Sequence, residues 1–302
     1  MRLKIVAVTT RGRGCTFLRT TVPSLDTPSR QGKPNVHLVP CMAPSKYENI
    51  EVVHLDNITK IVLKRPEKKN AISFEMYKGI TSALREAGED DSVFTVVTGY
   101  GDYFSSGNDL SNALRLFTGN LEETMKESSG AVREMVHTII DFPKPLIAMV
   151  NGPAIGIATT MLGLFDLVYA SDKATFNTPF SKLGQYPEGC SSYIFPKIMG
   201  LAKATEVLLF NKTLTAWEAC NVGLVTEVFP DATFQQEVWS RLRDYAALPK
   251  NCLALSKQLI RNVEKEKLHA VCAKEFELLS KRINSEDAIN ALQQFFQRKS
   301  KL

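Results

Sequence analysis

The stretch "PLIAMVNGPAIGIATTML", Pro145 to Leu162, contains the pattern on which the fold prediction rests. The five apolar residues after Pro145 are typical of a buried strand. The glycines and the proline that follow predict a turn, and the run from Ile157 predicts a helix. A second buried strand, "VFTVVTG", leads in the same way into the glycine-containing loop "YGDYFSSGNDL". A chain that repeats strand, turn and helix in this order is predicted to form an α/β domain.

The rest of the chain from residue 48 extends this pattern. "NIEVVHLD" and "ITKIVLKR" flank Asp56-Asn57 and predict a hairpin. Ser73 is a good N-cap for a helix that ends near Gly88. "FDLVYASDKATFNTP" predicts one or two strands and "LVTEVF" one more, and helices are expected from about residue 234 to residue 298. We therefore expect one domain over residues 48–302 whose C-terminal part, from about 230, is helical.

The charge of the chain is concentrated in its first 46 residues. They hold eight Lys or Arg and one acid, Asp26, so their net charge is +7. The remainder of the chain carries −2, which gives the total of +5. A basic face with stacking aromatic residues, as nucleic-acid binding requires, is not predicted. The most apolar stretch, residues 145–167, is interrupted by Asn, Gly, Pro and Thr, so no membrane span is predicted.

Both ends of the chain resemble targeting signals. Residues 1–47 are rich in Arg, Ser and Thr and are predicted to be a basic leader, either disordered or a transit peptide for the mitochondrion. The final tripeptide, Ser300-Lys301-Leu302, matches the S-K-L signal that a peroxisomal import receptor binds. The peroxisome is therefore the expected location, with the mitochondrion as the alternative.

Several classes of site are not predicted. The six cysteines are widely spaced without a C-x-x-C, and the four histidines lack zinc-binding spacing, so free thiols and no metal are expected. G-x-S-x-G and G-x-x-x-x-G-K-[ST] do not occur, and Gly99 and Gly101 lack the third glycine of a dinucleotide-binding turn. These observations remove the main support for hydrolase, kinase and dehydrogenase functions.

Two glycine-containing segments remain as candidates for a site. "FSSGNDL" and "NGPAIGIATT" each follow a buried strand, and ligands of α/β sheets bind at the carboxyl ends of strands. Two backbone N–H groups that converge there would form an oxyanion hole, although each segment taken alone is also compatible with an ordinary turn.

Three segments in order, "RPEKKNAIS", "FSSGNDL" and "NGPAIGIATTMLGLFDLVYASDKATF", resemble the crotonase, or enoyl-CoA hydratase/isomerase, superfamily. The resemblance covers residues 47–302 and is closest to the peroxisomal enoyl-CoA isomerases. It implies a crotonase-like spiral of ββα repeats with a C-terminal helical extension, assembled as a homotrimer or a dimer of trimers. It implies an acyl-CoA thioester substrate and no cofactor, since coenzyme A is part of that substrate. Those isomerases commonly carry an acyl-CoA-binding domain ahead of this one, which we expect this chain to lack.

The resemblance also assigns site residues. It places the oxyanion N–H donors at Asn108 and Ile157, and hydratases of the family carry their two glutamates at positions that here hold Thr160 and Phe180. A single acid, Glu188 in "YPEGCSS", matches the loop that carries the glutamate of the peroxisomal isomerases. The expected catalytic residues are Glu188, Asn108 and Ile157, and the expected substrate-binding residues are Ser106, Gly107, Asn108, Asp109, Leu110, Gly156, Lys68 and Lys69.

One carboxylate is sufficient for moving a double bond from the β,γ to the α,β position of a thioester. The base takes a proton from the α carbon and returns one to the γ carbon, while two amides stabilise the dienolate oxygen. Apolar surroundings are expected to raise the pKa of Glu188. Lys68 and Lys69 either contact CoA phosphates or are solvated. The alternatives to an isomerase are an enoyl-CoA hydratase and a non-catalytic acyl-CoA-binding scaffold.

Overall fold

The chain divides into two structural units, Met1–Lys46 and Tyr47–Leu302. The computed structural model describes residues 5–8, 16–19, 46–109 and 121–282, together with a few separate positions from 285 to 297. In the first unit, β1 (Ile5–Val8) and β2 (Thr16–Arg19) pair antiparallel. The sequence predicts a basic leader without strands in this region, so this strand pair was not predicted.

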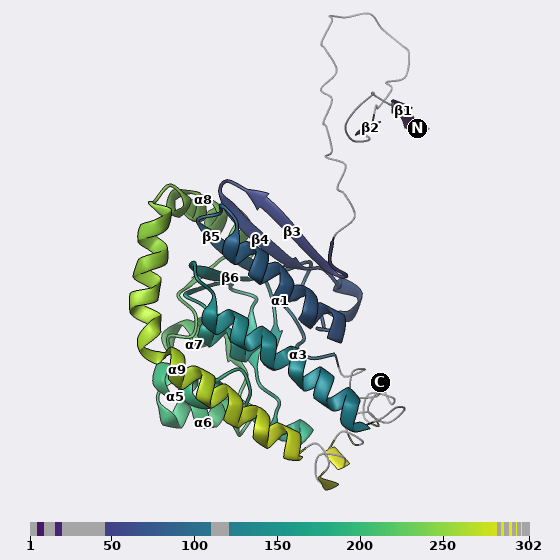
Figure 1. Ribbon diagram of the computed structural model, residues 1–302, viewed down its shortest axis with the longest axis vertical. Helices are drawn as coiled ribbons and strands as arrows, with labels where there is room; N and C mark the ends of the chain where they lie inside the picture. Colours follow the sequence, from purple (N-terminus) through teal and green to yellow (C-terminus); the bar gives the residue numbers. More distant parts are fainter. Residues whose placement is uncertain are drawn as a thin grey trace, which may run out of the picture. The chain divides into compact units, whose positions relative to one another are not determined.

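A six-stranded sheet, in the order β11-β8-β6-β5-β4-β3, forms the centre of the second unit (Figure 1). β3 (Ile50–Leu55) and β4 (Ile58–Leu63) form the predicted hairpin, and Asp56 and Asn57 both adopt positive φ in its turn. Such a pair of left-handed residues is typical of two-residue hairpin turns. The other neighbouring strands pair parallel: β5 (Phe94–Gly99), β6 (Leu146–Val150), β8 (Leu167–Ser171) and β11 (Glu227–Phe229).

A second, smaller sheet has the order β10-β9-β7. Its strands are β7 (Ala154–Ile155), β9 (Thr175–Asn177) and β10 (Leu214–Thr215). Isolated parallel bridges from Ile72 to Asn108 and from Ser105 to Ala154 extend the same arrangement. Each turn of the chain thus contributes one strand to the large sheet, one short segment to the second and then a helix. This is the ββα spiral that the resemblance to the crotonase superfamily implies.

Three long helices lie side by side over the sheet, with α3 (Leu121–Asp141) packed between α1 (Phe74–Glu89) and α9 (Lys250–Arg282) (Figure 1). Ser73 caps α1, because its hydroxyl accepts a hydrogen bond from the Met76 N–H at 3.2 Å. The remaining helices are α4 (Ile157–Thr160), α5 (Ser191–Met199), α6 (Leu201–Leu208), α7 (Ala216–Asn221) and α8 (Phe234–Ala246), with 3₁₀ turns η1 (Pro66–Lys68), η2 (Met161–Leu164) and η3 (Ser181–Leu183).

The large sheet is buried on both faces. Along β6, Leu146, Ala148 and Val150 join one hydrophobic cluster with α1 and α3, whereas Ile147 and Met149 join a second cluster with α8. Successive side chains of a strand point to opposite faces, so a continuous apolar run is what a doubly covered strand requires. The uninterrupted "LIAMV" therefore follows from the two helical layers.

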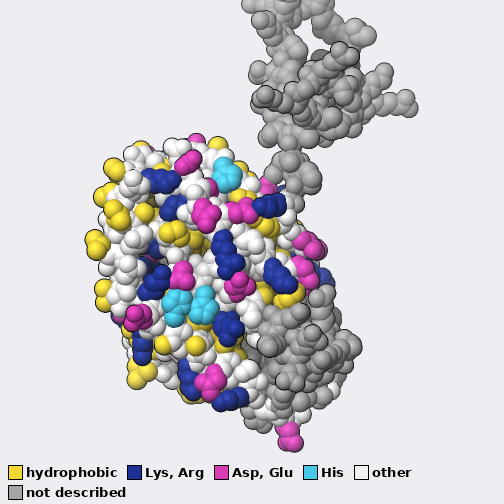
Figure 2. Space-filling view, in the orientation of Figure 1, with side chains coloured by type: hydrophobic (Ala, Val, Ile, Leu, Met, Phe, Trp, Pro, Cys, Tyr) yellow, Lys and Arg dark blue, Asp and Glu magenta, His cyan; other side chains and the backbone are white. Residues whose placement is uncertain are grey.

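The face of the molecule in Figure 2 carries Lys, Arg, Asp and Glu side chains interspersed with one another. Such mixing does not give the single-sign surface that nucleic acids bind. None of the helices in the described part of the chain combines the length and apolar content that crossing a bilayer requires.

Candidate active site

The two glycine-containing segments meet at the carboxyl ends of β5 and β6. These strands are parallel neighbours, and the Ile155 N–H donates to the Ser105 carbonyl at 3.0 Å just beyond them. Gly107 adopts φ +81°, and a Cβ there would lie 2.3 Å from the Ile155 oxygen. Only glycine permits this conformation and this approach. The structure thus brings together the two segments that the sequence pointed to.

Backbone hydrogen bonds fix the peptide groups around Asn108, the first of the two predicted oxyanion donors. Ile72 bonds to the residues on either side of Asn108: its N–H donates to Gly107 O at 2.8 Å, and its carbonyl accepts from Asp109 N at 3.0 Å. In a parallel bridge of this kind the peptide groups of Asn108 itself point to the opposite edge, the edge where Ser105 bridges Ala154.

The second predicted amide belongs to Ile157, the first residue of α4, and the helix supplies no acceptor for an N–H at that position. The preceding Gly156 has φ +60° and donates its own N–H to Asn177 O at 2.8 Å. This bond fixes the entry into α4, so the direction of the Ile157 N–H is set by the backbone.

The predicted substrate-binding side chains occupy different settings. Lys68 and Lys69 are exposed, and both of their carbonyls accept hydrogen bonds from Ser106. Asp109 pairs with Arg65 at 2.6 Å, and both side chains are mostly buried, so this ion pair ties the first turn to the glycine segment. Leu110 lies outside the described residues, as do Ser300-Lys301-Leu302.

Glu188 lies in the loop between η3 and α5, and this loop packs against the second glycine segment. The next residue, Gly189, has φ +67°, and a Cβ there would lie 2.9 Å from Thr160 Oγ1 and 3.2 Å from Ile157 Cδ1. Thr160 is fully buried. The residue that follows Glu188 therefore contacts Thr160, the residue at one of the two positions where hydratases of the resembled family carry a glutamate.

The surroundings of Glu188 favour its protonated form. Burial is the main cause, and the charge of Glu275 adds to it, so that the pKa of Glu188 is raised to about 8. Among the described residues none donates a hydrogen bond to its carboxyl group, although part of the residue remains accessible. Burial, and after it the charge of Glu188, raises the pKa of Tyr77, a 1% exposed residue of α1, well above its usual value.

Two contributors to the site do not stand out in the sequence. Glu275 on α9 is 5% exposed and accepts hydrogen bonds from the residues just after Glu188. Asn70 is fully buried and holds the first turn, because its amide donates to the carbonyls of Tyr100 and Tyr103 at 2.9 and 2.7 Å. Glu275 could have been noticed as the one acid on the buried face of a helix that also presents Leu268, Cys272 and Phe276.

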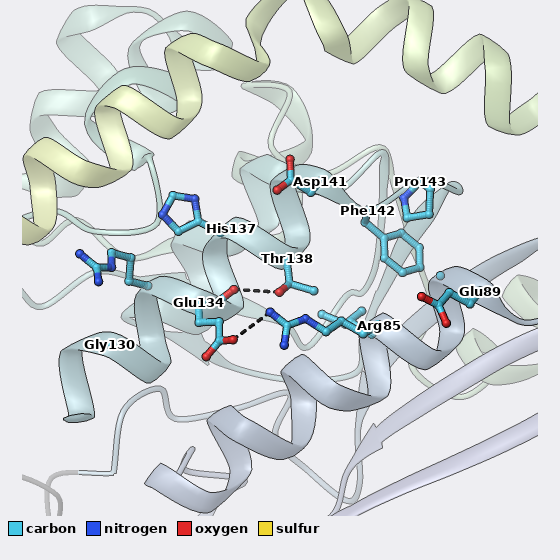
Figure 3. Close-up of a pocket in the computed structure, with 12 residues that line it drawn as sticks. Arg85, Glu89, Gly130, Glu134, His137, Thr138, Asp141, Phe142 and Pro143 are labelled. Atoms are coloured by element: carbon cyan, nitrogen blue, oxygen red, sulfur yellow. Dashed lines mark hydrogen bonds and ion pairs between the residues drawn. The ribbon is translucent and has the colours of Figure 1, made fainter. Parts of the chain in front are cut away.

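A separate surface cavity of about 720 Å³ lies between α1 and α3 (Figure 3). Arg85 and Glu134 form an ion pair at 2.8 Å in it, and His137 and Asp141 lie along its edge. Glu188 does not line this cavity, nor do the described residues of the two glycine segments, so it is distinct from the candidate site. No group of His, Cys, Asp and Glu suited to a metal ion occurs among the described residues.

The ββα spiral, the paired glycine segments and the acid with a raised pKa are typical of one class of protein, and comparison identifies the same class. The chain matches the family described as Enoyl-CoA hydratase/isomerase over residues 54–301. It belongs to that family, which confirms the resemblance of the three sequence segments.

Particular relatives are similar over most of the chain. Enoyl-CoA delta isomerase 2 of Homo sapiens is 60% identical over 85% of this chain, and the match spans 65% of the human protein's own length. "Enoyl-CoA delta isomerase 3, peroxisomal" of Mus musculus is 55% identical over 84% of this chain and 80% of that protein. A crystal structure of an enoyl-CoA hydratase/isomerase from Pseudoalteromonas atlantica T6c is 33% identical, with a TM-score of 0.75 over 83% of this chain and 98% of that chain.

Proposed function

We propose that this protein is an enoyl-CoA isomerase that converts 3-enoyl-CoA, cis or trans, to trans-2-enoyl-CoA in the oxidation of unsaturated fatty acids. The observation that carries the proposal is the position of Glu188. One carboxyl group with a raised pKa belongs to the loop that packs against α4, the helix whose first N–H is the predicted oxyanion donor. The relatives that are 55–60% identical bear the name of this activity.

In the proposed reaction the Glu188 carboxylate removes the proton from the α carbon of the substrate. The electrons of that C–H bond form a double bond between the α carbon and the carbonyl carbon, and the carbonyl π electrons move to the thioester oxygen. The product is a dienolate that still holds its β,γ double bond and carries its negative charge on the thioester oxygen. The N–H groups of Asn108 and Ile157 donate to that oxygen, and fixed donors of this kind contribute about 3–4 kcal/mol each in other enzymes. Glu188 then gives a proton to the γ carbon, which binds it with the β,γ π electrons. The thioester carbonyl re-forms, the electrons between the carbonyl and α carbons become the new α,β double bond, and Glu188 is again a carboxylate.

A hydratase is the main alternative, and the arrangement of acids disfavours it. Adding water needs one group to activate the water and a second to protonate the α carbon. Thr160 and Phe180 occupy the positions of the two family glutamates, and both are buried. The second carboxylate near Glu188 is Glu275, and both of its oxygens already accept hydrogen bonds. One proton-transferring group is therefore what the site offers.

The proposal includes binding partners and a location. Lys68 and Lys69, exposed beside the first glycine segment, would contact the CoA phosphates, and no cofactor would be needed apart from the CoA of the substrate. The peroxisome is the proposed compartment, because the mouse relative is named peroxisomal. Where Ser300-Lys301-Leu302 forms the C-terminus, the peroxisomal import receptor would bind it. A mitochondrial location through the leader remains the alternative.

We also propose self-association through α9. The side chains of Leu255, Leu259, Ile260 and Val263 are 60–85% exposed on this helix. They recur at helical spacing and form one apolar stripe, and stripes of this kind mark contact surfaces. A second copy of the chain, in a homotrimer or a dimer of trimers, is the proposed occupant.

Two parallel assays separate the possible functions. The purified protein is given a 3-enoyl-CoA in one and a trans-2-enoyl-CoA in the other, over a series of chain lengths. The proposal expects rapid formation of trans-2-enoyl-CoA in the first and little 3-hydroxyacyl-CoA in the second. Faster hydration than isomerisation would establish the hydratase, and binding without turnover of either substrate would establish the scaffold.

A further inference from the structure

Glu275 reaches from α9 to the backbone that directly follows Glu188. Its Oε2 accepts a hydrogen bond from the Cys190 N–H at 2.7 Å, and its Oε1 accepts from the Ser192 N–H at 3.0 Å and the Ser192 hydroxyl at 2.5 Å. From this geometry we infer that Glu275 is a positioning residue: it fixes the loop that presents Glu188, and it places a second negative charge beside that base.

The positioning follows from the way α5 begins. Cys190, its N-cap residue, adopts φ +62°, and its side chain does not cap the helix, so the N–H groups of the first turn need another acceptor. Glu275 provides it from a different helix, and a carboxylate is favourable at this positive end. The Glu188 carbonyl is held at the same time, since the Ser191 hydroxyl donates to it at 2.8 Å. The backbone is therefore fixed from the Glu188 carbonyl through Ser192.

The charge of Glu275 is the second part of the inference. Titratable groups come from three elements: Tyr77 on α1, Cys190 at the start of α5, and Cys272 and Glu275 on α9. No Lys or Arg of the described residues contributes to the pKa shift of Glu188 or of Glu275. Two carboxyl groups that share such a region cannot both lose their protons easily, so one of them is kept basic.

Hydrogen bonding decides which of the two carboxyls holds the negative charge. Burial raises the pKa of Glu275, but its hydrogen bonds from Ser192 and Cys190 act against this shift. Glu188 has burial and the neighbouring charge acting on it, and both raise its pKa. Glu275 is thus the better-stabilised anion, and Glu188 is the group that takes up and releases the proton.

The test of this inference, which rests on the proposed isomerase function, is the pH dependence of kcat/KM for a 3-enoyl-CoA in Glu275→Gln. The amide removes the charge, and its NH₂ group cannot accept the bonds that the carboxylate accepts. We expect the midpoint of the rising limb to fall by about one pH unit, because the pKa of Glu188 falls when a neighbouring like charge is removed. Glu277→Gln is the matched control: Glu277 lies two residues away on α9, is exposed, and pairs with Lys274 and Lys281. It should keep the wild-type midpoint.

A midpoint in Glu275→Gln that is unchanged or higher than in the wild type overturns the inference, whatever happens to kcat. If Glu275→Gln does not fold, Glu275→Asp decides, because it keeps the charge and shortens the reach. We then expect at least a fivefold loss in kcat with KM within twofold of the wild type, and a smaller loss in kcat overturns the inference. Glu188→Gln, assayed beside these variants, separates the two hypotheses: if it stays active, the proposed role of Glu188 fails as well.

Discussion

The surroundings of Glu188 favour the protonated form of its carboxyl group. Its sequence neighbours are Gly, Pro, Cys and Ser, and the structure adds Tyr77 and Glu275 but no basic residue of the described chain among the causes of its pKa shift. A nearby Lys or Arg would lower the pKa and weaken the group as a base. The lack of an ion-pair partner for Glu188 in the described part of the chain is thus consistent with proton transfer at a carbon atom.

The raised pKa predicts the pH dependence of activity. The deprotonated form is the base, so kcat/KM for a 3-enoyl-CoA should rise about tenfold per pH unit at low pH and level off near pH 8. The stability of the folded state changes with pH in the opposite direction. The pKa in the folded state, about 8, exceeds the ordinary 4.5, so folding loses stability as the pH rises through that interval. Steady-state rates from pH 5 to 9 test the first statement, and a limb with its midpoint below pH 6 would contradict it.

The site residues that could be predicted from sequence are those that act through local backbone or stand in a recognisable loop. Gly107, Gly156 and Glu188 belong to such segments. Glu275 could not be assigned in the same way, because its role depends on the packing of α9 against the start of α5, 83–85 residues away in the chain. Long-range contacts of this kind are absent from any local pattern.

At the scale of elements, α4 is important because its first residue, Ile157, supplies one of the two predicted oxyanion N–H donors. Ile157→Pro removes that N–H at the helix position where proline is best tolerated. We expect kcat to fall by about 10²–10³, the loss seen when one oxyanion donor is removed. Ile157→Ala is the control, since it also removes the buried side chain but keeps the N–H. Asn108→Ala, which likewise keeps its N–H, should be mild. Equal losses in Ile157→Pro and Ile157→Ala would show that the side chain, and not the amide, is responsible.

The loop that carries Glu188 depends on the contact of Gly189 with α4. In Gly189→Ala, the new Cβ would meet Thr160 Oγ1 at 2.9 Å and the backbone would keep an unfavourable positive φ. Gly200→Ala is the matched control, because Gly200 has φ +77° and nothing within 4 Å of its added Cβ. Both should lose about 1–2 kcal/mol in the free energy of unfolding. Only Gly189→Ala should lower kcat as well, and equal kcat values in the two variants would contradict this account.

The elements themselves were predictable where their signals are local. The β3–β4 hairpin, the Ser73 cap and the apolar run of β6 were correctly predicted. The two-residue strands β7 and β10 were missed, because neighbours in the second sheet define them and no alternating pattern does. The helix α5 was missed as well: it contains Pro196, and its N-terminal N–H groups are satisfied by Glu275 from elsewhere in the chain.

At the scale of the whole molecule, the exposed stripe on α9 predicts self-association. The wild-type protein should elute in size-exclusion chromatography with multi-angle light scattering as a trimer or hexamer. Leu259→Glu places a charge at a side chain that is 79% exposed, and it should lower the measured mass. Gln258→Glu is the control, because it adds the same charge at the adjacent exposed position outside the stripe. A mass that Leu259→Glu leaves unchanged would exclude this part of α9 from the interface.

The central claim is that one carboxyl group, Glu188, carries out both proton transfers of an isomerase. The most direct measurement is kcat/KM of Glu188→Gln for a 3-enoyl-CoA, followed by the absorbance of the 2-enoyl thioester, with the wild type at the same pH. We expect a loss of at least about 10²–10⁴-fold, the range attributed to a positioned acid or base, with the fold and substrate binding retained. A folded Glu188→Gln variant within tenfold of the wild-type rate would contradict the claim.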